Sequence, residues 1–449
     1  MFSIRWGGGG CVVAAGILAA VALPGVAMGE TLMDAYKLAR QSDPKYRSAQ
    51  YEAQAMDTQS DQALAGLLPT IKFDASQVDT RQRVLSSNNP IFGAGVTSFP
   101  TETWTLSLSQ PLFRMDLIER FRQVKAVLRQ AQYTVLAAEQ DLMLRTTTAY
   151  LAVLAADDGL ALAKAERVAV ARGQELARER LKMGLGTITN LYDATARYAV
   201  TQAREIEAEN KLNDARQALK EITGKLVFNY QALRPKFTPV NPEPPVLERW
   251  VEQAHEQNLV LRARSEAIEV ARQEVERQRA GHYPSVNLLA SRNLNDSGST
   301  LFGGGSKVET STLTLQLSVP IYQGGLVNAV TKEAAFRYQK AQEEREQERR
   351  GVERATRSAF QGTISGLSLV QALTQSVSSQ QSALEAKEEG FKAGVFPLLP
   401  VLDAQRDLFI AKRDYAQSRY DYLVNSLKLK QAAGTLSEAD LESIGAALQ

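Results

Sequence analysis

Two stretches of the chain alternate apolar and polar residues, as β-strands with one apolar and one polar face do. Their apolar positions are Trp104, Leu106, Leu108, Leu313, Leu315 and Leu317. Thr, Ser and Gln residues fill the positions between them. A half-buried sheet of a soluble protein would show the same alternation. A tilted strand of about 9–11 residues also crosses a bilayer, with its apolar face on lipid and its polar face on water. The pattern predicts β-hairpins at 69–113 and 284–322.

Long proline-free stretches follow both hairpins and predict very long helices. Their residues favour helix, and the predicted helices run over 115–183 and 325–393. Each would be about 100 Å long. They are too highly charged to span a membrane, and their many Ala residues allow close packing, as in a tube of helices. After a glycine turn, a second helix returns over 187–224 and 399–433.

The chain contains two copies of one unit. Residues 39–75 align without gaps on residues 254–290, and a later strand, a turn glycine and a closing glycine align in the same order. Five prolines between the copies predict an extended linker. Each unit is expected to hold an opening helix, a hairpin, a long helix and a returning helix. The predicted organisation is a signal peptide (1–29), a first repeat (30–232), a linker (233–246), a second repeat (247–434) and a C-terminal tail (435–449).

The N-terminus has the features of a secretory signal. Arg5 precedes a short apolar stretch, and Ala27 and Gly29 are small residues placed for cleavage. Cys11 precedes the apolar stretch, whereas a lipidation site follows one, so lipid attachment is not expected. No later stretch of about 20 residues is apolar enough for a membrane helix, so any crossing must use strands that close into a barrel.

Composition excludes several classes of function. The net charge is only +2, with no clustered basic face for nucleic acid. His255 and His282 lack metal-ligand spacing, and no catalytic constellation or phosphate loop is present, so we expect no enzyme activity, metal or cofactor. Strands that close into a barrel and continue into long helices would make a transport duct. A structural or adhesive envelope protein with a helical stalk is the alternative.

Four strands cannot close a barrel alone, because the smallest common outer-membrane barrels have eight. Two chains would supply eight strands, and three would supply twelve around a wider lumen. The strand count therefore requires an oligomer without fixing the number of copies.

Several short motifs recur in the same order in both repeats or flank their strands. They are Leu67-Leu68-Pro69, Gln110-Pro111-Leu112, Val319-Pro320-Ile321, Gly184-Leu185, Asp193-Ala194, Gly394-Val395, Asp403-Ala404 and the closing Gly434-Thr435-Leu436. In their order and duplication, these motifs resemble the TolC family of outer-membrane efflux and secretion proteins. The resemblance covers nearly the whole chain after the predicted signal.

The resemblance implies a mainly helical protein with transmembrane strands. It implies a homotrimer with a 12-stranded barrel in outer-membrane lipid, joined to a long periplasmic helical barrel. The linker and the C-terminal tail would contribute to a belt around this barrel. The implied partners are a periplasmic adaptor and an inner-membrane pump, either an ATP-binding-cassette exporter or a proton-driven pump. Without a lipid site, type I protein secretion is favoured over drug efflux.

The helix turns must lie at the periplasmic end, because each long helix starts at the strands and runs away from the membrane. The candidate residues of an aperture at these tips are Gly184, Asn190, Asp193, Phe391, Gly394, Phe396, Pro400 and Asp403. Rings of Asp193 or Asp403 would make an acidic aperture, although both could be solvated residues near a helix N-terminus. Pro400 and Asn190 stand where related proteins could carry acids. A closing contact made by apolar residues is therefore an equal alternative to the acidic aperture.

Overall fold

The computed structural model describes residues 31–86, 95–227, 230–234, 237–299 and 304–448. The predicted signal peptide at 1–29 lies outside the described residues, and so does part of the predicted linker. The described chain has two successive sets of helices and strands. The first set comprises α1 (Leu32–Ser42), α2 (Pro44–Ala65), β1 (Thr70–Val84), β2 (Gly95–Phe113), α3 (Met115–Lys182) and α4 (Ile188–Thr223). The second comprises α5 (Leu247–Gln257), α6 (Leu259–Arg279), η1 (Ala280–His282), β3 (Ser285–Ser297), β4 (Ser306–Ser318), α7 (Leu326–Lys392), α8 (Leu398–Ala433) and α9 (Glu438–Ala447).

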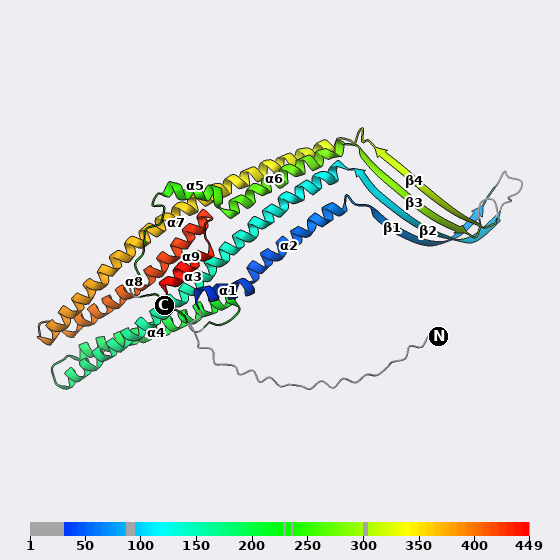
Figure 1. Ribbon diagram of the computed structural model, residues 1–449. Helices are drawn as coiled ribbons and strands as arrows, with labels where there is room; N and C mark the ends of the chain where they lie inside the picture. The colour runs from blue at the N-terminus through cyan, green and yellow to red at the C-terminus, as the bar shows by residue number, and fades with distance from the viewer. Residues whose placement is uncertain (1–30, 87–94, 228–229, 235–236, 300–303, 449) are drawn as a thin grey trace, which may run out of the picture.

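The strands form one antiparallel sheet at one end of an elongated molecule (Figure 1). Its order is β1-β2-β3-β4, so the two hairpins lie side by side. Thr70 lies opposite Ser109 in the first hairpin, and Ser285 lies opposite Ser318 in the second. In the first hairpin, β1 runs to Val84 and β2 begins at Gly95. β4 ends at Ser318, before the expected Tyr322, because Pro320 has no N–H to donate to a ladder.

The opening helix of each repeat is two helices, where the sequence predicted one. Asp43 ends α1 and caps α2 by accepting a 2.8 Å bond from the Tyr46 N–H, and Pro44 occupies the first helical position. Asn258 separates α5 from α6 in the same way, accepting a 3.0 Å bond from the Leu261 N–H. Local capping causes both breaks, because Asp and Asn side chains compete with the helix for backbone N–H donors.

The long helices α3 and α7 have 68 and 67 residues and start where the strands end. At 1.5 Å per residue, each is about 100 Å long. They run to the far end of the molecule, where α4 and α8 turn back along them (Figure 1). Gly184 and Gly394 make these turns in the left-handed backbone conformation, with φ of 72° and 74°.

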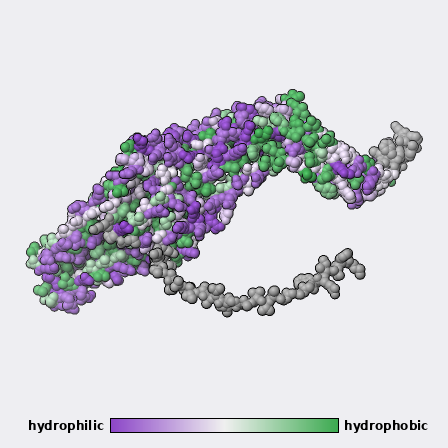
Figure 2. Space-filling view, viewed as in Figure 1, coloured by the Kyte–Doolittle hydropathy of each residue, from purple (hydrophilic) through white to green (hydrophobic). Residues whose placement is uncertain are grey.

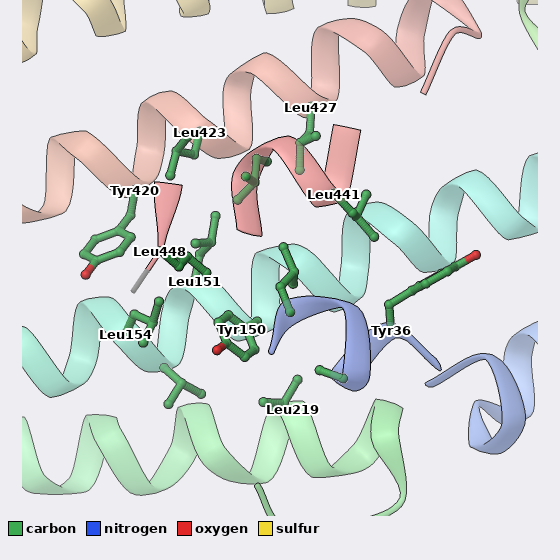
Figure 3. Close-up of a cluster of buried hydrophobic side chains, with 14 of the residues drawn as sticks. Tyr36, Tyr150, Leu151, Leu154, Leu219, Tyr420, Leu423, Leu427, Leu441 and Leu448 are labelled. Atoms are coloured by element: carbon green, nitrogen blue, oxygen red, sulfur yellow. The ribbon is translucent and has the colours of Figure 1, made fainter. Parts of the chain in front are cut away.

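The main core lies midway along the helices, where short helices pack against α3, α4 and α8. Figure 3 shows Tyr36 of α1, Tyr150 and Leu151 of α3, and Leu441 of α9 converging there. All four side chains are at most 1 % exposed. A bridge between Leu233 and Leu448 ties the segment before α5 to the end of the described chain. The core thus fixes the helical arms at their middle and leaves the strands and the tips to project from it.

Candidate functional site: a two-faced sheet and the helical tips

One face of the sheet is apolar over the half nearest the helices. Ile71 lies opposite Leu108, Leu108 lies opposite Ala290, and Ala290 lies opposite Leu313, so one apolar row continues across all four strands. Leu313, Leu315 and Leu317 are 74 %, 66 % and 65 % exposed. Apolar residues gather where helices and strands meet, and polar residues dominate further out (Figure 2). Such a contiguous exposed apolar surface is typical of a contact with lipid or with another protein.

The opposite face of the same sheet is polar. Asn293 donates a 2.8 Å hydrogen bond to the Thr105 hydroxyl, and the Ser291 and Thr312 hydroxyls lie 2.7 Å apart. Lys72 and Asp74 form an ion pair of 2.7 Å on this face. The two faces therefore suit an apolar medium and water respectively.

No helix among the described residues is long and apolar enough to cross a membrane. In the same part of the chain, no group of three or more His, Cys, Asp or Glu side chains is placed to hold a metal ion.

The predicted tip residues fall into two helical hairpins that meet at the far end. Gly184 ends the α3–α4 hairpin, and Asn190 lies in the first turn of α4, where its N–H bonds to the Thr187 hydroxyl at 3.3 Å. Gly394 ends the α7–α8 hairpin, and Pro400 lies in the first turn of α8. A proline is tolerated there, because the N–H groups of a first turn have no partner within the helix.

An apolar cluster joins the two hairpins near their tips. Ala177 of α3 and Ala194 of α4 pack with Leu398 and Leu402 of α8. Leu402 lies so close to Gly173 of α3 that a Cβ there would stand 2.7 Å from its methyl group. The small residues therefore allow the hairpins to approach closely.

A cavity of about 350 Å³ lies between the same hairpins, and Phe391 and Phe396 are part of its lining. The Arg180 guanidinium lies 4.9 Å from the centre of the Phe391 ring. The Phe396 ring covers Gly390, where a Cβ would stand 2.4 Å from a ring carbon. Phe396 and Asn190 both line this cavity. Among the described residues that line this cavity, none is an Asp or a Glu.

Asp403 is already paired within the chain. Arg197 of α4 contacts its carboxylate at 2.7 Å, and Arg406 lies 3.5 Å from the same oxygen. Asp193 lines a separate groove with Arg197 and Arg406 and forms no ion pair with a described residue. The two predicted aspartates thus differ: one bridges the hairpins, and the other lies half-buried on α4.

Arg197 was missed at the sequence level, although the repeat carries a signal for it. With the turn glycines aligned, Asp193 corresponds to Asp403, and Arg197 corresponds to Asp407. The first repeat therefore has a cation at the position where the second repeat has an anion. Opposite charges on the two returning helices would favour a contact between these helices. Only the structure shows that the anion it meets is Asp403.

Comparison with known proteins gives a consistent result. The family model described as outer membrane efflux protein matches residues 35–225 and 250–435, which are the two repeats. The chain is similar to Outer membrane protein TolC of Vibrio cholerae, with 32 % identity over 422 residues that cover 94 % of each chain. It is also similar to the Proteases secretion protein PrtF of Dickeya chrysanthemi, with 30 % identity over 95 % of this chain and 92 % of the relative.

Solved structures agree on the fold. The crystal structure of CusC superimposes with a TM-score of 0.77 over 90 % of this chain and 92 % of CusC, at 18 % sequence identity. The structure of VceC from Vibrio cholerae gives a TM-score of 0.76 over 90 % of this chain and 96 % of VceC, also at 18 % identity.

Proposed function

Because this chain belongs to the outer membrane efflux protein family, we propose that it is the outer-membrane exit duct of an export system. The observation that carries the proposal is the two-faced sheet continuing into helices about 100 Å long. The apolar face contacts lipid, the polar face lines a lumen, and the helices extend this lumen through the periplasm. The duct is passive, and an inner-membrane pump supplies the energy.

Three copies form the duct in this proposal. Four strands from each copy give twelve strands, which leave room for a lumen that eight strands would nearly fill. A periplasmic adaptor holds the helical tips against the pump.

The cargo that we propose is a secreted protein, exported by an ATP-binding-cassette pump. Two relatives named for protease secretion support this choice, PrtF and the Alkaline protease secretion protein AprF of Pseudomonas aeruginosa. Their matches cover 95 % and 92 % of this chain, whereas the match to the Cobalt-zinc-cadmium resistance protein CzcC covers 67 %.

The tips close the resting duct in this proposal, and the closing contact is largely apolar. Arg197 neutralises Asp403 inside each copy, which weakens the mutual repulsion that a ring of bare carboxylates would have. Exposed Val395 and Phe396 then lie at the narrow end together with Leu399. Hydrophobic constrictions of this kind stop conduction by excluding water.

Purified protein tests the duct directly. In planar bilayers we expect a trimer that inserts and conducts weakly while its tips are shut. A monomer that never partitions into membranes would contradict the duct and favour a stalk protein. Deletion of the gene in the source bacterium tests the cargo. Loss of a protein from the culture medium supports secretion, whereas unchanged secretion with new drug or metal sensitivity would overturn the choice of cargo.

A further inference from the structure

The charged side chains of the strands are divided unequally between the two faces of the sheet. Because side chains alternate along a strand and the strand registers are known, each residue belongs to one face. The face with the apolar row from Ile71 to Leu313 carries most of the charges, beyond that row and toward the hairpin loops. Among them are Asp79, Glu102, Arg292, Asp296, Lys307 and Glu309. Charge is thus concentrated on the face that the proposed duct turns outward.

The polar face of the sheet consists mostly of hydroxyl and amide side chains. Among these are Thr105, Ser107, Ser291, Asn293, Thr312 and Gln316. Several side chains of this face bond to each other across strands, and the Thr101 and Ser297 hydroxyls, for example, lie 3.1 Å apart. Hydroxyls and amides both donate and accept hydrogen bonds. This face therefore interacts with acidic and basic molecules alike.

Lys72 and Asp74 are the charged residues of the polar face within the described strands. Both belong to β1 and are separated by one residue, so their side chains share a face. The Lys72 Nζ lies 2.7 Å from an Asp74 carboxylate oxygen, and the two side chains are 73 % and 51 % exposed. The pair thus places one positive and one negative charge at nearly the same point of the proposed lumen.

Uncharged polar residues lie across the strand from both members of the pair. Lys72 lies opposite Ser107, whose hydroxyl donates a 3.3 Å hydrogen bond to the Lys72 carbonyl oxygen. Asp74 lies opposite Thr105, whose hydroxyl accepts a hydrogen bond from Asn293. Within the described strands, Lys72 and Asp74 are therefore each other's ionic partner on this face.

An unpaired charge in a narrow lumen selects ions by their sign. Rings of acidic side chains favour cations and rings of basic side chains favour anions, because low-dielectric walls focus the field into the lumen. In a trimer, Lys72 or Asp74 alone would form such a ring, whereas the two together cancel. The charges of the outer face lie behind the sheet, and Lys307 and Asp296 among them form an ion pair of 3.0 Å.

We infer that Lys72 and Asp74 set the charge selectivity of the strand part of the lumen and that their pairing keeps this part neutral. The lumen then passes a polypeptide irrespective of its charge, while hydroxyls and amides exchange hydrogen bonds with its backbone. The cargo class that fits is an extended polypeptide with both acidic and basic stretches. The inference rests on the proposed duct and adds the residues that set the selectivity of its outer part.

The reaction of a reporter thiol with charged reagents measures the potential in the lumen. In a Cys11→Ser background, which removes the single native thiol, Ser107→Cys places a thiol opposite Lys72 and diagonal to Asp74. Purified trimers react with a cationic or an anionic methanethiosulfonate of similar size, and each rate is divided by the rate of the same reagent with a small free thiol. With Lys72 and Asp74 both present, we expect a cation-to-anion ratio of about 1, because a neutral lumen favours neither reagent.

Removal of one member of the pair should shift this ratio in the direction set by the charge that stays. Lys72→Gln leaves Asp74 and should raise the ratio by about three- to sevenfold, the effect of one unit charge roughly 7 Å from the thiol. Asp74→Asn leaves Lys72 and should lower the ratio by a similar factor. The double variant should return to the native ratio. Thr105→Cys, opposite Asp74, is a second reporter and should give the same signs.

The matched control is Arg292→Gln, which removes a charge from the other face of the sheet, next to Leu106 on β2. We expect less than about a twofold change in the ratio. A native ratio far from 1, no response to either single variant, or a double variant that stays shifted would overturn the inference. Each of these results comes from trimers that insert in planar bilayers, whereas failure of the proposed duct would leave monomers that do not insert.

Discussion

At the scale of single residues, the ion pair between Arg197 and Asp403 adds a charged contact between the two hairpins, beside the apolar packing of Leu402. The guanidinium and the carboxylate are 26 % and 36 % exposed, so water screens the pair only in part. A partly exposed ion pair stabilises by about 0.5–1 kcal/mol. In a ring of three copies, the pair would act three times on the same opening.

Replacement of Arg197 by Ala should open the duct more often. Loss of about 0.5–1 kcal/mol in each of three copies sums to about 1.5–3 kcal/mol, which shifts a closed–open equilibrium by about 10- to 150-fold. Single-channel recording in planar bilayers measures the open fraction. Arg413→Ala is the control, because the ion pair that Arg413 forms among the described residues is with its neighbour Asp414 on the same helix. An unchanged open fraction in Arg197→Ala would exclude the pair from the closing contact.

The environment of Asp43 leads to a second prediction, about how the stability of the fold depends on pH. Burial alone would raise the pKa of Asp43, but hydrogen bonds from Arg145 and from the Tyr46 N–H outweigh burial and lower it. The carboxylate therefore stabilises the fold above the pKa of the unfolded chain, about 3.9. This contribution is lost as the pH falls through the lower pKa of the folded state.

Asp43→Asn keeps an N-cap side chain but removes the charge facing Arg145. We expect a loss of about 1–3 kcal/mol at pH 7, and a smaller difference from the native chain below about pH 4. Thermal unfolding in detergent at several pH values measures both. A stability difference between Asp43→Asn and the native chain that grows as the pH falls would contradict a lowered pKa of Asp43.

The sequence predicted Asp403 as a tip residue but could not predict its partner. Arg197 is 206 positions away along the chain, and nothing local to either residue fixes the distance between two helices. The apolar alternative for the tip came from Pro400 and Asn190, whose side chains cannot carry the charge that an acidic ring needs. It remains a prediction.

At the scale of helices and strands, turn and cap residues made most boundaries predictable. Gly224 and Gly434 end α4 and α8 in the left-handed conformation, with φ of 73° and 76°. Proline-free stretches gave the long helices to within a residue or two. The breaks at Asp43 and Asn258 were not predicted, because helical propensity is high on both sides and only the capping bonds reveal them.

Two glycines with the same backbone conformation should respond differently to alanine. Gly394 is surrounded by open space, so Gly394→Ala costs only the left-handed strain of about 1–2 kcal/mol. At Gly434 a Cβ would stand 2.3 Å from the Gln257 carbonyl oxygen. The clash forces α5 away from α8, so we expect a further loss of at least about 2 kcal/mol. Equal unfolding temperatures for the two variants would contradict the close approach at Gly434.

At the scale of the whole molecule, the main core lies between the sheet and the helical tips. The main core fixes α1, α3, α4, α8 and α9 near their centres, while the sheet lies at one end and the tips at the other (Figure 1). The architecture was predictable because alternation, helix length and duplication all pointed to it. The number of copies was not, since four strands require closure without fixing how many chains provide it.

The two faces of the sheet should tolerate charge differently. Leu315→Arg puts a cation on the proposed lipid face, at a cost of about 2–4 kcal/mol near the middle of the bilayer. Gln316→Arg, one residue on, puts it on the polar face. We expect Leu315→Arg to reduce assembled protein in the outer-membrane fraction several-fold and Gln316→Arg to change conductance. Similar assembly of both variants would argue against lipid at the apolar face.

The shared register of the repeats has a consequence for the history of the gene. A half-length ancestor with one hairpin and one helical pair could close the same ring from six identical chains. Every contact between neighbours in such a ring would have one sequence, so no contact could specialise. Fusion of two halves lets corresponding positions diverge independently, as Arg197 and Asp407 have. It also lowers the number of separate chains that must meet from six to three, which makes assembly less dependent on concentration.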